Sequence, residues 1–141
     1  MWAKVDRFKA HPLFIGIRCR AEPFLADLHG STHLADLAHL AAAGLALDLI
    51  GPATDTGTPV GRRGLFSAGH LAAVAELAVL QPTLRIVINH AAGVPIDGEQ
   101  PAAEWLSAMQ GLAPHGNVYL KQSGQMEAAR TQPARAGESR S

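Results

Sequence analysis

The stretch LRIVINHAAGVPI, residues 84–96, decides the fold. It contains three consecutive β-branched residues, Ile86 to Ile88, which are typical of a strand that is buried on both faces. The run ends on Asn89 and His90, and a loop that contains glycine and proline follows. A strand made for burial thus carries an amide and an imidazole at its exit, which calls for an explanation.

Three further apolar runs predict strands in the rest of the chain. They are LFIGI at 13–17, LALDLI at 45–50 and NVYL at 117–120. Helical periodicity separates the strands, with helices predicted over 31–44, over 67–81 and from Pro101 onward. The alternation of strand and helix predicts an α/β fold with about four parallel strands and three right-handed crossover helices.

The predicted connections are of unequal length. The chain passes from helix to strand through very few residues, whereas it passes from strand to helix through long loops at 19–30, 51–65 and 91–100. In parallel sheets these long loops lie at the carboxyl ends of the strands. That edge holds the functional site in open α/β sheets and in barrels alike.

An ionisable side chain lies at or near the end of every predicted strand. These residues are Arg18, Asp48, His90 and Lys121. Strands in register would bring all four to one level near the carboxyl edge. A guanidinium, a carboxylate, an imidazole and an ammonium together could bind an anion and transfer a proton.

Each of these residues also has a purely structural interpretation. Arg18 and Lys121 could extend into solvent from the strand ends, and Asp48 could cap amides of the following loop. His90 could be a hydrogen-bonded core histidine. Cys19 is expected to be a small buried hydrophobic residue.

Composition excludes several classes of protein. Lys plus Arg and Asp plus Glu both number 12 in the 141 residues, so no basic surface for nucleic acid or an anionic membrane is expected. The most apolar region, residues 34–50, is interrupted by polar residues and predicts no membrane span. A single cysteine and the lack of a secretory signal indicate a cytoplasmic protein. No Walker, GxGxxG, HExxH or GxSxG motif occurs.

Four motifs in order resemble the amidohydrolase 2 family, and in particular its lactonase-like branch, which includes fuconolactonase and 2-pyrone-4,6-dicarboxylate lactonase relatives. They are LFIGIR (13–18), GLALDLIG (44–51), INHAAGVPI (88–96) and NVYLKQSG (117–124). The resemblance covers residues 3 to 128. It implies part of a (β/α)8 TIM barrel and hydrolysis of a lactone, ester or amide of a small acidic or hydroxylated substrate.

The resemblance also implies roles for individual residues. His90 would polarise the substrate carbonyl, or bind a divalent metal such as zinc if the complete enzyme is metal-dependent. Arg18 would bind carboxylate or hydroxyl groups of the substrate, and Lys121 and Ser123 would line the same rim. Asp48 matches an acidic position that we group with the substrate-binding residues.

The chain departs from the family pattern in two places. The His-x-His pair of the first barrel strand and the aspartate of the last strand have no counterpart. We therefore expect a fragment without the first and last barrel strands, inactive alone, with a barrel domain over 1–128 and a disordered polar tail over 129–141.

Two alternatives remain open from the sequence. The chain could be a self-sufficient, flavodoxin-like open α/β module that binds or interacts without catalysis. It could also form a homo-oligomer, or pair with a complementing half of a barrel, because four strands alone leave two exposed edges.

Overall fold

The computed structural model describes residues 2–51, 64–96 and 98–124. The part it describes contains a single four-stranded sheet and five α-helices, and all three strand pairs are parallel. In chain order the elements are α1 (Trp2–Phe8), β1 (Gly16–Arg20), α2 (Ala21–Ala26), α3 (Ser31–Ala42), β2 (Ala46–Ile50), α4 (Ala68–Leu80), β3 (Arg85–Ile88), the turn η2 (His90–Gly93), α5 (Ala103–Leu112) and β4 (Val118–Leu120).

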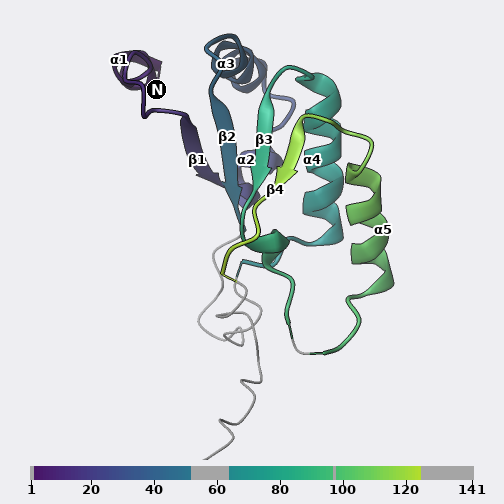
Figure 1. Ribbon diagram of the computed structural model, residues 1–141. Helices are drawn as coiled ribbons and strands as arrows, with labels where there is room; N and C mark the ends of the chain where they lie inside the picture. The colour runs from purple at the N-terminus through teal and green to yellow at the C-terminus, as the bar shows by residue number, and fades with distance from the viewer. Residues whose placement is uncertain (1, 52–63, 97, 125–141) are drawn as a thin grey trace, which may run out of the picture.

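The strands lie in the sheet in the order in which they occur in the chain, β1-β2-β3-β4. Figure 1 shows their carboxyl ends pointing the same way, with α4 and α5 side by side along the β4 half and α1 and α3 at the amino end. The predicted α/β fold is therefore confirmed. The flavodoxin-like layout is wrong, because such folds reverse the strand order at a switch point and this sheet does not.

The core lies between the sheet and the helices. Alternate side chains of the two central strands are buried on the helix side: Leu47, Leu49, Ile86 and Ile88. Helix α4 packs against them through Leu71, Val74 and Leu77, which are also buried. Because burial of each such side chain is worth about 1.5 to 3 kcal/mol, this layer supplies the main stabilisation of the sheet.

Local signals set the ends of the helices. The Ser67 hydroxyl caps α4 by accepting from the His70 amide, and the His70 ring accepts from the Ser67 amide in return. Gly44, in the short connection from α3 to β2, has φ +67, a left-handed conformation that favours glycine. The Trp105 indole of α5 donates to the Phe66 carbonyl and ties this helix to the start of α4.

The structure corrects two details of the predicted elements. β1 begins at Gly16 rather than Leu13, because Leu13 lies in a turn and is 82% exposed. The predicted loop 19–30 is wrong, since β1 continues to Arg20 and α2 follows directly. Most of the predicted loop 51–65 and the whole predicted tail 129–141 lie outside the described residues.

The second face of the sheet has no helix over it in the part of the chain that the structure describes. Arg18, Asp48, Val87 and Tyr119 lie opposite one another in the strand register and therefore share this face. We call it the open face. Among the described helices, none has the length and apolar content needed to cross a membrane.

Ile86→Ala tests the core. Ile86 is completely buried in a central strand, so we expect the free energy of unfolding to fall by about 2 to 5 kcal/mol, as is typical of a cavity in a packed core. Urea denaturation followed by circular dichroism measures the loss. Val79→Ala, at a side chain that is 66% exposed, is the control, with an expected change within about 0.5 kcal/mol. Equal effects of the two substitutions would contradict this assignment of the core.

Candidate functional site

One carboxylate oxygen holds two cations at the open face. Asp48 Oδ2 accepts from Arg18 Nη2 at 2.8 Å and Nε at 3.2 Å, and from Lys121 Nζ at 3.0 Å. The Asp48 side chain is 17% exposed, whereas those of Arg18 and Lys121 are 54% and 42% exposed. We call these three residues the Asp48 cluster. Its formal charge is positive, because two cations share one anion.

The tilt of the strands explains how Lys121 reaches Asp48. Arg18 is the register partner of Asp48, but the partners of Asp48 on the next strands are Val87 and Tyr119, and Lys121 comes two residues after Tyr119. In a barrel with eight strands and a shear of 8, equal height along the axis is reached about one residue later on each successive strand. Lys121, the residue directly after β4, is therefore level with Asp48 on β2.

The sequence predicted that the four ionisable residues meet at one level, but the structure gives hydrogen bonds among only three of them, Arg18, Asp48 and Lys121. His90 lies in the turn after β3, and Ser123 lies in the segment after β4. The Ser123 hydroxyl lies 3.1 Å from Nδ1 of the His90 ring, and no hydrogen-bond partner of Nε2 occurs within the described residues. The predicted residues thus form two adjacent groups on one rim, the Asp48 cluster and a His90–Ser123 pair.

The turn η2 holds His90 in an unusual backbone conformation. His90, Ala91 and Ala92 have φ values of 53, 48 and 59, although none of them is glycine. Such left-handed residues cost about 1 to 3 kcal/mol each and persist only where surrounding contacts impose them. Here the Ala91 amide donates to the Lys121 carbonyl, and the Phe66 amide donates to the Ala92 carbonyl.

Gly124 allows the segment that follows β4 to approach His90. A Cβ atom at Gly124 would lie 2.8 Å from Nδ1 of His90, closer than real Cβ contacts. The backbone of Gly124 has φ +70, which also favours glycine. Strain and close packing at one rim are typical of residues kept for a function rather than for stability.

Asn89 is a site residue to which the sequence analysis gave no role. Its side chain is 2% exposed, yet neither of its amide atoms has a hydrogen-bond partner within the described residues. Oδ1 of Asp48 is buried without a partner in the same way. The period of two in a strand was the missed signal, because it places Asn89 on the same face as Val87, the open face.

Three structural interpretations can now be judged. The core interpretation of His90 is wrong, because the residue is exposed. Asp48 accepts from Arg18 and Lys121, and the loop that it could have capped lies largely outside the described residues. Cys19 is half-buried against the core, and burial raises the pKa of its thiol, so that the reactive thiolate is disfavoured at neutral pH.

The described residues do not fit a zinc ion. Structural and catalytic zinc sites use at least three protein ligands, and no group of three His, Cys, Asp or Glu side chains with that geometry occurs in 2–51, 64–96 and 98–124. Asp48 already binds two cationic groups, which would repel a divalent ion. The metal role of His90 stays a prediction, and we derive no step through a metal.

Comparison with known proteins agrees with this architecture. The family model described as Amidohydrolase matches residues 4–140. L-fucono-1,5-lactonase of Burkholderia ambifaria is 47% identical over 60 residues, which are 43% of this chain and 20% of that protein. The structure of Amidohydrolase 2 from Bifidobacterium longum subsp. infantis superimposes with a TM-score of 0.53 at 24% identity, over 77% of this chain and 35% of that one. This chain therefore spans a fifth to about a third of the length of these relatives.

Asn89→Leu tests whether the buried amide lacks a partner. Because an unpaired buried amide costs about 1 to 3 kcal/mol, we expect the substitution to raise the free energy of unfolding by about 1 kcal/mol or more. Asn117→Leu is the matched control: the Asn117 amide donates to the carbonyls of Ala78, Gln81 and Leu84, so its loss should destabilise the protein by about 1 to 3 kcal/mol. Thermal and urea unfolding measure both variants. Destabilisation by Asn89→Leu would show that the amide has a partner in the isolated protein.

Proposed function

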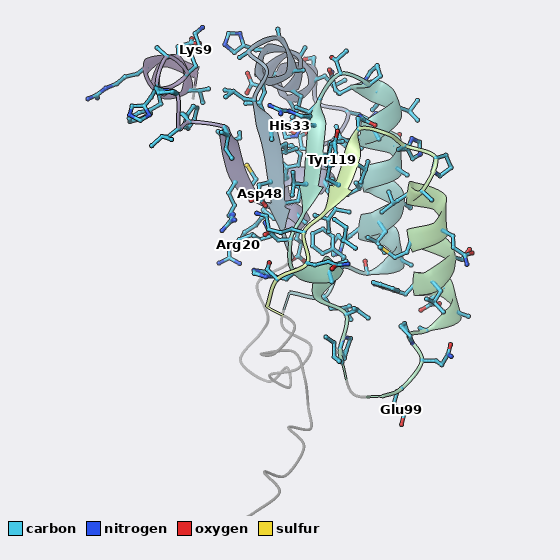
Figure 2. The ribbon with its side chains drawn as sticks, in the orientation of Figure 1. Lys9, Arg20, His33, Asp48, Glu99 and Tyr119 are labelled. Atoms are coloured by element: carbon cyan, nitrogen blue, oxygen red, sulfur yellow. The ribbon has the colours of Figure 1, made fainter. Side chains whose placement is uncertain are left out.

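Because the chain belongs to the amidohydrolase family, we propose that its carboxyl rim forms part of the substrate site of a hydrolase that opens a lactone of a small hydroxylated or acidic compound. The partial match to a lactonase favours a lactone over an amide. The Asp48 cluster is the observation that carries the proposal. Figure 2 shows Asp48 on the sheet near the strand ends, with Arg20 beyond it and Tyr119 on β4.

Stability does not account for the Asp48 cluster. Ion pairs with partners as exposed as Arg18 and Lys121 contribute only about 0 to 1 kcal/mol each. The shared carboxylate instead fixes the positions of a guanidinium and an ammonium that come from strands far apart in the chain. Their remaining donors and the excess positive charge suit a carboxylate or a set of hydroxyl groups on a substrate.

Asp48 and Asn89 add further polar atoms to the same face. Oδ1 of Asp48 can accept a hydrogen bond, and the Asn89 amide can both donate and accept. The unpaired state of these buried atoms supports a polar ligand here, because buried polar groups in folded proteins are nearly always hydrogen-bonded.

His90 is suited to act on the carbonyl group. The Ser123 hydroxyl can donate to Nδ1, which places the ring proton on Nε2, the nitrogen without a described partner. An Nε2–H group directed at the lactone carbonyl would stabilise the negative charge that develops on its oxygen. Water then adds to the carbonyl carbon, the ring C–O bond breaks, and the leaving oxygen takes up a proton.

The general base of this reaction is not supplied by the two groups described. Both cations of the cluster bind Asp48 through Oδ2, so this oxygen is already occupied by two donors and is not free to accept from an attacking water molecule. The base would come from a carboxylate outside the described residues. We therefore propose that the chain in isolation binds the acid product of such a lactone but does not hydrolyse the lactone.

Titration of the isolated chain with an aldonic acid such as L-fuconate tests this proposal. We expect Arg18→Gln and Lys121→Gln each to weaken binding by about 10- to 100-fold, because a hydrogen bond to a charged group is worth about 1.5 to 3 kcal/mol. NMR chemical shifts measure the affinity. Arg7→Gln removes the same charge from α1, remote from the rim, and should leave binding unchanged.

Two outcomes would contradict the proposal. Wild-type affinity in both Arg18→Gln and Lys121→Gln would place the binding site elsewhere. Hydrolysis of L-fucono-1,5-lactone by the isolated wild-type chain, lost in His90→Ala, would show that the chain carries its own base and would refute the proposed lack of activity.

A further inference from the structure

Arg20, the last residue of β1, is a second arginine on the open face. Side chains of a strand alternate between its two faces, so Arg20 shares a face with Arg18. The backbone of Arg20 is extended, with φ −75 and ψ 134, and therefore continues this alternation. Cys19 before it packs against the core and Ala21 after it is completely buried, which leaves the Arg20 side chain on the opposite face.

The Arg20 guanidinium is unpaired in the part of the chain that the structure describes. No hydrogen bond or ion pair involves it there, although Glu22 follows two residues later in α2. Arg18, by contrast, binds Asp48 through both Nε and Nη2. One edge of the Arg18 guanidinium is thus occupied, whereas the five donors of Arg20 remain available for a ligand.

Arg20 doubles the excess positive charge of the rim. The Asp48 cluster consists of two cations and one anion, so the single carboxylate of an aldonic acid would offset its excess charge. Arg20 adds one more cation, and no described carboxylate forms an ion pair with it. Charges of one sign gathered on one surface attract ligands of the opposite sign. The rim therefore suits a ligand with two anionic groups.

We propose that Arg20 binds a carboxylate that the lactone itself carries, so that the preferred substrate is an acidic lactone, such as the monolactone of a sugar dicarboxylic acid. This inference rests on the proposed function, because it names the substrate class of the same rim. Hydrolysis of a neutral sugar lactone yields a product with one carboxylate, whereas an acidic lactone yields a dicarboxylate. Arg20 determines specificity in this assignment and takes no part in bond breaking.

The positions of the two arginines suit such a ligand. Arg20 lies two residues beyond Arg18, which separates their Cα atoms by about 6.6 Å along the strand, at about 3.3 Å per residue. Figure 2 shows Arg20 beyond Asp48, toward the carboxyl ends of the strands. A small ligand bound at the Asp48 cluster would therefore meet Arg20 only through a substituent that projects toward the rim.

The chemistry of the guanidinium selects a carboxylate for that substituent. Its planar fork donates two parallel hydrogen bonds to the two oxygens of one carboxylate, and it keeps its charge throughout the physiological range of pH. A hydroxymethyl group at the same place offers one oxygen and no charge. Arg20 therefore favours an acidic ligand over a neutral ligand of the same size.

Titration of the isolated chain with two matched acids tests the inference. Galactarate and L-galactonate have the same carbon chain and the same configuration of hydroxyl groups, and they differ only in a terminal carboxylate or hydroxymethyl group. We expect galactarate to bind about 10- to 100-fold more tightly, the range expected for a hydrogen bond to a charged group. NMR chemical shifts measure both affinities.

Arg20→Gln should abolish this preference. Its affinity for galactarate should fall by about 10- to 100-fold, while its affinity for L-galactonate should change far less. In the wild type, the Arg20 Nε–H resonance should shift on binding of galactarate but not of L-galactonate. Arg7→Gln removes the same charge from α1, remote from the rim, and is the matched control that should keep the preference.

The results that contradict this inference differ from those that contradict the proposed function. Equal affinity of the wild type for both acids, or a preference that persists in Arg20→Gln, would overturn the role of Arg20 alone. An equal loss of both affinities in Arg20→Gln would do the same, as would loss of the preference in Arg7→Gln. Binding of neither acid by the wild type would overturn the proposed function, and this inference with it.

Discussion

Burial of the helix-facing residues of β2 and β3 against α4 is the interaction on which the rest of the structure depends. Leu47, Leu49, Ile86 and Ile88 alternate with residues of the open face, so each strand is fixed in register and in orientation. A slip by one residue would exchange the two faces and bury Asp48. The same burial that stabilises the sheet therefore sets where its polar residues lie.

The rim combines the Asp48 cluster with a strained turn. Three consecutive left-handed residues at 90–92 carry the imidazole, and hydrogen bonds to the backbone of Lys121 and Phe66 hold them in place. Lys121 takes part in both groups of the site: its backbone supports the turn of His90 and its ammonium binds Asp48. A change in the position of β4 would therefore displace both groups together.

The open face and the open edges follow from one cause. A parallel sheet with sequential strand order and helices on one side curves toward closure, and its inner face is normally covered by the remaining strands of a barrel. Four strands leave this face uncovered within the described residues, and the Asp48 cluster and Tyr119 lie on it. The position of the candidate site and the exposure of apolar edges thus have a common structural origin.

The sequence by itself determined the α/β class, the four strands and three of the helices, because hydrophobic periodicity and helix-terminal residues act locally. It also identified Arg18, Asp48, His90 and Lys121 as the residues at the strand exits, and the family resemblance added Ser123. Only the tertiary structure decided which of them meet. Asp48 joins Arg18 and Lys121, and His90 joins Ser123. Because the strands are tilted, residues at equal height on neighbouring strands are not direct register partners, and the spacing of residues along one strand does not reveal this shift. For the same reason the unpaired amide of Asn89 became visible only in the fold, since whether a buried group has a partner depends on every segment packed around it.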